Sequence, residues 1–197
     1  MTIGGETFKV PQPFLVMATQ NPIETDGTYP LPEAQVDRFM MKVLVGYPSE
    51  EEEFVIVERV TGVAAEVSPV MNTDEMKELQ KECRKVYVEP SLIQYAVKLA
   101  NATRVPDKYL TYGASPRASI HLIEGARALA FLRGRDYALP EDVTDLVPDV
   151  FRHRLVLSYE ALAEGLTADQ LIQNLLRKVR PPARALNPHA RAAAVGA

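Results

Sequence analysis

Residues 14–22 read FLVMATQNP, and this stretch decides how the fold begins. Its first six residues form an apolar run between a proline and polar residues, a pattern typical of a buried β-strand. A second apolar run, MMKVLV at residues 40–45, predicts another buried strand. Between them, LPEAQVDRF predicts a short helix, because Pro32 suits a first turn and is followed by acidic Glu33. The first quarter is therefore expected to run strand, short helix, strand.

From Ser49 onward the pattern becomes helical. Ser49 followed by four glutamates predicts an N-cap with an acidic first turn, and we interpret these glutamates as a solvated helix start rather than a regulatory patch. Further helices are expected over residues 73–85, 90–102, 116–133, 140–152 and 168–179. Thr167 and Gln170 have capping-box spacing at the start of the last helix, and Gly134 fits the end of the helix before it.

The composition is that of a soluble globular protein. The chain has 197 residues, is 47% hydrophobic and carries a net charge of −4. Cys83 is its single cysteine, which fits a reducing compartment and excludes a disulfide scaffold. Its apolar runs are far shorter than the roughly 20 residues of a membrane span, and its first residues lack the order of a signal peptide. We therefore expect a cytoplasmic protein without membrane contact.

The last residues differ from the rest of the chain. After Asp169 no acidic residue follows, and from Pro181 the composition is mainly Ala, Pro and Arg. Such a segment buries too little apolar surface to order itself, so a disordered tail is favoured over contact with an acidic partner. The predicted organisation is an α/β piece over residues 1–48, a helical domain over 49–180 and a disordered tail over 181–197.

Two candidate site residues lie in the first piece. Asn21 follows an apolar strand, where α/β folds place ligand contacts, but its local pattern also fits a turn before Pro22. Arg38 ends the predicted short helix and can reach outward. The alternative is a surface ion pair with adjacent Asp37 or a nearby acid, worth at most about 1 kcal/mol.

The third candidate is Arg117, in the stretch YGASPR at residues 112–117. Ser115 is the expected N-cap and Pro116 the first helical residue, so Arg117 falls in the first turn. A cation there opposes the helix dipole by roughly 0.3–1 kcal/mol. A phosphate bound at the helix N-terminus would explain this charge, and an exposed arginine tolerated at small cost explains it equally well.

Other chemistry finds little support. The three histidines are far apart in sequence and lack cysteine or carboxylate partners at ligand spacing, so we expect no metal site. Ser115 and Ser119 lack a nucleophile elbow, which argues against covalent hydrolysis. Cys83 lies in a charged helical stretch and is interpreted as a bystander.

Taken together, the candidates resemble one family. The stretch FLVMATQNPIETDGTYPLPEAQVDRFMMKVLVGYPSEEEE resembles the region from sensor 1 to the arginine finger of MoxR-type AAA+ ATPases. The stretch YGASPRASIHLIEGARALAFLRGRDYALPEDVTDLVPDVFRHRL resembles the helical lid of that family with its sensor-2 motif. The resemblance implies an α/β remnant of a AAA+ nucleotide-binding domain followed by an all-α helical lid, mainly helical overall, and spans roughly residues 5–179.

The resemblance assigns a role to each candidate. Asn21 matches sensor 1, which orients the attacking water near the γ-phosphate. Arg38 matches the arginine finger, which neutralises charge on a nucleotide held by a neighbouring subunit; such fingers are worth about 10³ to 10⁵ in rate. Arg117 matches sensor 2, which couples lid position to nucleotide state, in its own subunit or in a neighbour.

The sequence departs from the family in one respect. No glycine is followed by lysine, so a P-loop is missing, and no apolar strand ends in the paired acids of a Walker B motif. The chain is therefore expected to represent the carboxyl-terminal part of such an ATPase, beginning inside a hairpin before the sensor-1 strand. We expect it to be inactive alone and to bind no nucleotide tightly.

For the intact protein, the resemblance implies Mg²⁺-dependent ATP hydrolysis in a homo-oligomeric ring of six subunits. Its clients would be protein complexes remodelled or activated in a chaperone-like role, through metal-cofactor insertion or assembly, including von Willebrand factor A-type domain proteins. One alternative is a non-hydrolysing lid module that supplies Arg38 in trans to full-length rings. A nucleic-acid motor is disfavoured by the net charge of −4 and by a 7% aromatic content without tryptophan.

Overall fold

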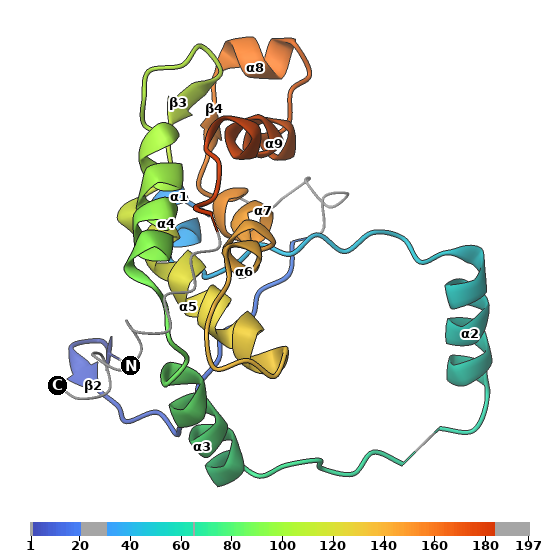
Figure 1. Ribbon diagram of the computed structural model, residues 1–197. Helices are drawn as coiled ribbons and strands as arrows, with labels where there is room; N and C mark the ends of the chain where they lie inside the picture. Colours follow the sequence, from blue (N-terminus) through green and yellow to red (C-terminus); the bar gives the residue numbers. More distant parts are fainter. Residues whose placement is uncertain (1, 21–30, 65, 184–197) are drawn as a thin grey trace, which may run out of the picture. The chain divides into compact units, whose positions relative to one another are not determined.

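The computed structural model describes residues 2–20, 31–64 and 66–183. Its first elements are the strands β1 (Thr2–Ile3) and β2 (Glu6–Thr7), then the helices α1 (Glu33–Val36), α2 (Glu50–Thr61), α3 (Thr73–Arg84) and α4 (Pro90–Ala102). There follow β3 (Leu110–Tyr112), α5 (Pro116–Leu132), α6 (Pro140–Thr144), α7 (Val147–Phe151), β4 (Val156–Leu157), α8 (Tyr159–Ala163) and α9 (Ala168–Lys178) (Figure 1). The expectation of a mainly helical chain is confirmed.

The chain divides into two compact units. The first is made of Met1–Ile23 and Leu44–Lys81, and the second of Glu24–Val43 and Glu82–Ala197. The second unit therefore takes in α1 and the residues that follow it, as well as every element from α4 to α9. The site candidates Arg38 and Arg117 both belong to this unit.

The first unit contains a short hairpin and a capped helix. In the hairpin, Thr2 pairs with Thr7 across a turn whose two glycines, Gly4 and Gly5, have positive φ. In α2, the Ser49 side chain accepts a hydrogen bond from the Glu52 amide while the Glu52 carboxylate accepts one from the Ser49 amide. This capping box confirms the predicted helix start.

The two apolar runs are not strands in the structure. Neither residues 14–19 nor residues 40–45 form a strand, and Met40 lies in a bend. Leu15, Met17 and Val45 are 78%, 82% and 92% exposed. A strand buried on both faces needs neighbours that bond its backbone and cover its side chains. Within the described part of the chain neither run pairs with another strand. Residues 40–42 bond to residues 149–154 instead, and most side chains of both runs are exposed, so the strand predictions were wrong.

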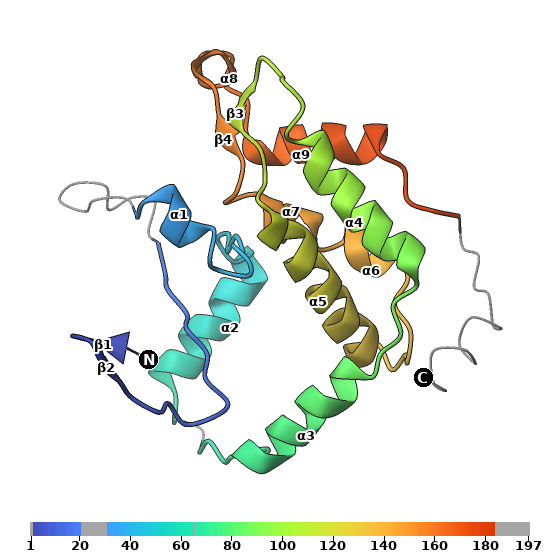
Figure 2. The same ribbon diagram turned by 90° about the vertical axis from the view of Figure 1, so that its left-hand side faces the viewer.

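The second unit is a helical domain built on α4 and α5. These two helices run side by side in both views (Figures 1 and 2), and α6, α7 and α9 complete the packing. The buried side chains are mostly aliphatic, with one phenylalanine, and include Leu92, Leu99, Leu122, Phe151 and Ile172. The buried face of α5 is made mostly of small residues, with Ala118, Ala126 and Ala130 beside Leu122. The helices α4, α6, α7 and α9 supply further buried side chains to the core.

The predicted helices are mostly present. The helix over 90–102 is found with those limits, and α3, α5 and α9 each end one residue earlier than expected. The predicted helix over 140–152 is two helices, because Pro148 has no amide to bond the carbonyl of residue 144. Gly134, with φ of 70°, follows α5 as expected. The strands β3 and β4 and the helix α8 were not predicted.

Two further expectations concern membrane-spanning helices and the C-terminal tail. Among the residues that the structure describes, no helix is long and apolar enough to cross a lipid bilayer. The tail predicted over residues 181–197 lies, from residue 184 on, outside the described residues.

Candidate functional site

The structure places two of the three predicted site residues. Asn21 lies outside the described residues. Arg38 follows Asp37, the C-cap of α1, and Arg117 lies in the first turn of α5. Both arginines belong to the second unit, so their surroundings can be compared directly.

The loop before α5 is held by the end of α4. The Thr103 hydroxyl donates to the Ala100 carbonyl at 2.7 Å and accepts from the Ala114 amide at 2.9 Å. The Arg104 Nε atom donates to the Ala114 carbonyl at 2.8 Å. Both backbone groups of Ala114 are therefore bonded to Thr103, the C-cap of α4, and to Arg104 directly after it. This arrangement fixes the chain just before the N-cap of α5.

Gly113 is required by a close backbone approach in this loop. A Cβ atom at this position would lie 2.2 Å from the Thr103 carbonyl oxygen and 2.5 Å from its carbon. Because these atoms belong to backbone, a rotamer change cannot relieve the overlap. The glycine therefore allows the loop to reach Thr103, and the next two residues place Ser115 at the N-cap, where its hydroxyl accepts from the Arg117 amide at 3.2 Å.

The charge of Arg117 is balanced by Asp37. The Arg117 Nη1 atom donates to Asp37 Oδ2 at 2.8 Å, and the Ser115 hydroxyl donates to Asp37 Oδ1 at 2.7 Å. A carboxylate of the same unit thus occupies the anion position at the start of α5, where the helix dipole favours it. The Arg117 side chain remains 50% exposed. The misplaced positive charge seen in the sequence is explained by this internal partner.

A buried arginine, Arg154, lies behind Asp37. Its side chain is only 1% exposed, and its Nε donates to Asp37 Oδ1 at 3.1 Å. Its two terminal nitrogens donate to backbone carbonyls and to the Nδ1 atom of His121, the latter at 2.8 Å. Asp37 therefore accepts hydrogen bonds from three side chains. It is the centre of a cluster formed by Asp37, Ser115, Arg117, His121 and Arg154.

Sequence analysis did not identify Arg154, and it offered an ion pair of Arg38 with Asp37 or a nearby acid only as an alternative. Asp37 was considered as a surface partner of Arg38, but its bonded cations are Arg117 and Arg154. Within the described part of the chain, the exposed Arg38 guanidinium has no hydrogen bond or ion pair. No local pattern marks Arg154, because its partners are more than 30 residues away in sequence apart from Val150.

The cluster has distinctive electrostatics. Burial would raise the pKa of Asp37, but hydrogen bonds from Ser115 and Arg117 and the charge of Arg154 outweigh it, so this pKa is lowered. Burial lowers the pKa of His121, and the nearby charge of Arg154 lowers it further. Burial also lowers the pKa of His153, although its hydrogen bond to the Phe39 carbonyl opposes the shift. Both imidazoles are therefore neutral acceptor or donor groups at neutral pH.

The exposed groups in and beside this cluster are positively charged and are suited to bind an anion. The guanidinium groups of Arg38 and Arg117 are both partly exposed and can contact an anion. No group of three His, Cys, Asp or Glu residues suited to a metal ion occurs in residues 2–20, 31–64 and 66–183.

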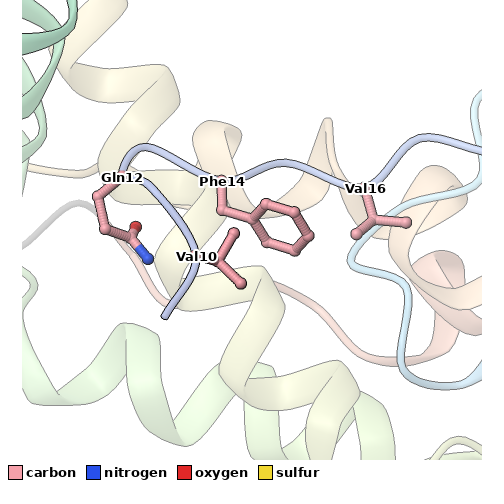
Figure 3. A pocket seen from close by; sticks show the side chains of 4 residues that line it. All are labelled: Val10, Gln12, Phe14 and Val16. Atoms are coloured by element: carbon pink, nitrogen blue, oxygen red, sulfur yellow. The ribbon is translucent and has the colours of Figure 1, made fainter. Parts of the chain in front are cut away.

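In the first unit, Val10, Gln12, Phe14 and Val16 line a shallow pocket (Figure 3). Its lining is apolar except for one amide, so it offers no comparable charge.

Two family models match the chain. The AAA lid domain matches residues 101–175, which cover the end of α4 through most of α9. The ATPase family associated with various cellular activities matches residues 1–41, which include Arg38. The class of protein that these matches and the helical lid define is the AAA+ ATPases.

Curated relatives narrow the class. Chaperone MoxR1 of Mycobacterium tuberculosis is 46% identical over 92% of this chain and 50% of its own length. YeaC of Bacillus subtilis is 39% identical over 92% of this chain and 57% of its own, and Protein MoxR of Paracoccus denitrificans is 32% identical over 77% and 51%. A crystal structure from Cytophaga hutchinsonii, assigned as an ATPase, superposes with a TM-score of 0.87 at 44% identity, covering 93% of this chain and 58% of that one. The chain belongs to the MoxR-type AAA+ ATPases, and it spans about half the length of the curated relatives it matches.

Proposed function

We propose that this chain provides the region from sensor 1 to the lid of an ATPase that hydrolyses Mg²⁺-ATP to remodel or activate protein complexes. The observation that carries the proposal is the exposure of the Arg38 side chain on a fixed backbone. Its guanidinium is exposed and without a partner in the described residues, while the backbone on both sides of it is bonded to the lid. An arginine held in this way is suited to contact a group outside its own unit.

Each predicted site residue has a role in this proposal. Asn21 would orient the attacking water as sensor 1, and Arg38 would neutralise charge on the transferred phosphoryl group as the arginine finger. Arg117 would act as sensor 2. Since Asp37 already binds Arg117, a phosphate group at this position would have to replace the carboxylate as its partner.

The residues of this chain fit only the phosphate end of Mg²⁺-ATP. Arg38 and Arg117 match its negative charge, whereas the sequence has no Gly-Lys-Ser/Thr to wrap the phosphates. When bound in a complete subunit, Mg²⁺-ATP supplies the phosphoryl group that is transferred to water. We therefore propose that this chain by itself does not hydrolyse ATP, and that complete subunits form a cytoplasmic homo-oligomeric ring, six-membered by family resemblance.

Protein complexes are the proposed clients. The relative from Mycobacterium tuberculosis is named as a chaperone, which supports a chaperone-like role in assembly or metal-cofactor insertion. Proteins with von Willebrand factor A-type domains are the candidate partners by family resemblance. A second mode of action is a lid module without turnover of its own, which supplies Arg38 to a ring of complete subunits; the exposed guanidinium supports this mode as well.

The test compares turnover by the chain alone with turnover by mixtures. Complete MoxR-family subunits whose own arginine finger is replaced by alanine would be mixed with this chain or with its Arg38→Ala variant. We expect no Mg²⁺-dependent turnover by the chain alone and stimulation of the mixture only when Arg38 is present. Turnover by the chain alone that depends on Arg38 would overturn the proposed inactivity. Equal rates with and without Arg38 would overturn its role as a finger.

A further inference from the structure

A short segment around Arg38 is bonded at several positions to α7 and to the residues directly after it. This finger segment comprises residues 37–42. The carbonyls of Asp37, Phe39, Met40 and Lys42 each accept hydrogen bonds from the side chains of residues 152–154. The Lys42 amide donates to the Asp149 carbonyl at 2.8 Å. Arg38 therefore projects from a segment whose backbone is fixed before and after it.

Arg154 makes most of these bonds. Its Nη2 atom donates to the Asp37 carbonyl at 2.9 Å and also to the Phe39 carbonyl, and its Nη1 donates to the Met40 carbonyl at 3.2 Å. The same side chain donates from Nε to the Asp37 carboxylate. Because this guanidinium is buried, it is not available to a ligand. Its contacts are with the backbone that carries Arg38.

Asp37 extends this connection to Arg117. One of its oxygens accepts from Arg154 and Ser115, and the other accepts from Arg117. The residue directly before Arg38 thus links the finger segment to the first turn of α5. The segment also contacts α5 through its side chains: a Cβ atom on Gly125 would lie 3.2 Å from Met41 Cε.

We propose that Arg154 is the positioning residue of Arg38, and that Asp37 makes the finger segment and Arg117 respond together to any change at Arg154. This inference rests on the proposed function only where it says that Arg38 acts on a nucleotide. A planar guanidinium with several donors in fixed directions suits four bonds to one segment, whereas a lysine ammonium cannot reproduce that fork. A methionine fills similar space without any donor.

The first experiment measures anchoring without turnover. Amide hydrogen exchange is followed in the full chain and in its Arg154→Met variant. The matched control is Arg135→Met, since Arg135 is also largely covered and bonds a buried carboxylate, that of Asp142, outside the finger segment. We expect exchange over residues 39–42 to accelerate at least about tenfold in Arg154→Met, with α4 unchanged. Unchanged exchange over residues 39–42 in Arg154→Met would overturn the anchoring. Equally faster exchange across α4 in Arg154→Met and Arg135→Met would overturn it too, because the effect would then be a general loss of stability.

The second experiment measures whether anchoring matters for Arg38. In the mixture with finger-deficient complete subunits, Arg154→Met should lower kcat by about 10²-fold at unchanged KM for ATP, because a displaced group loses its alignment with the reacting atoms. Arg154→Lys should restore part of this loss, and Arg135→Met should leave kcat unchanged.

The outcomes separate the two proposals. Where the unaltered chain fails to stimulate the mixture, the proposed function falls, and hydrogen exchange alone decides the anchoring. Where exchange shows release of the finger segment but kcat stays constant, the positioning role of Arg154 is overturned while the proposed function stands.

Discussion

The Arg117 guanidinium and the Asp37 carboxylate form an ion pair at 2.8 Å across a sequence separation of 80 residues. This pair joins the residue before Arg38 to the first turn of α5. It also explains how α5 tolerates a cation where the helix dipole disfavours one. Arg117 and the segment that carries Arg38, which are far apart in the sequence, are thus joined through Asp37 in the folded unit.

Replacing Asp37 with alanine should destabilise the second unit strongly. The buried Arg154 guanidinium would lose its carboxylate partner, and removing one member of a buried pair costs about 3–5 kcal/mol. The measurement is the free energy of unfolding from urea denaturation. Asp74→Ala is the control, because its solvent-exposed pair with Lys77 should contribute little to stability. Equal losses in both variants would contradict the central position of Asp37.

Stability should fall on mild acidification. The folded-state pKa values of His121 and His153 lie below their ordinary value of about 6.5, so the unfolded chain binds more protons than the folded one as pH drops through that value. The free energy of unfolding should therefore be constant above about pH 7 and decrease from about pH 6.5 toward the lowered pKa values. Urea denaturation at several pH values measures this slope.

The carboxylates contribute little to the change in the free energy of unfolding over this pH range. The lowered pKa values of Asp37 and Asp142 mean that their stabilising contributions are complete above about pH 4 and are lost only on further acidification. The double variant His121→Gln and His153→Gln should have a flatter profile between about pH 5 and pH 8. An unchanged slope in that variant would show that other groups cause it.

Gly113→Ala should disturb the loop before α5. The added Cβ would overlap the Thr103 backbone, which must shift, and overpacking of this kind costs about 1–3 kcal/mol. Gly46→Ala is the matched control, because that Cβ would meet nothing within 4 Å. Thermal denaturation followed by circular dichroism compares the two. A Gly113→Ala protein as stable as the Gly46→Ala protein would refute the close approach.

Thr167→Ala should weaken the start of α9. The threonine hydroxyl accepts from the Gln170 amide, and loss of such a cap costs about 1 kcal/mol. Because Ile172 and Leu175 anchor α9 in the core, the loss should appear in the unfolding of the second unit. Thr167→Ser keeps the hydroxyl and should retain most of the stability in the same urea titration.

The exposed apolar residues of the first unit should promote self-association. Leu15, Met17 and Val45 lie outside helices and strands, with most of their surface in contact with solvent. Size-exclusion chromatography with light scattering should detect oligomers that diminish in a Met17→Lys, Val45→Lys variant. A monomer at all concentrations for the unaltered chain would contradict this expectation.

Local sequence was sufficient to predict the helices whose ends are marked by caps and prolines. Ser49, Pro90 and Thr167 each indicate a helix start through their own chemistry, and the structure confirms all three. The break between α6 and α7 also had a local signal, Pro148, which was read as part of a continuous helix. Residues 14–19 lacked such a signal, because an apolar run becomes a strand only beside other strands.

The cluster around Arg154 was beyond local prediction. Arg154 meets Asp37 across a separation of 117 residues, and no spacing rule connects positions so distant. The family resemblance indicated Arg38 and Arg117 but neither Asp37 nor Arg154. Only the folded unit shows that Asp37 bonds Arg117 and that the buried Arg154 bonds the backbone on both sides of Arg38.

The bonds between the finger segment and Arg154 determine where an expressed lid domain should begin. A lid expressed from residue 49 onward, where the sequence suggested a boundary, would keep Arg154 but lose its acceptors on Asp37, Phe39 and Met40. A buried guanidinium stripped of these partners is costly, so such a product should be poorly folded and sparingly recovered. An expression boundary placed before α1 retains those acceptors and gives the lid its natural covering.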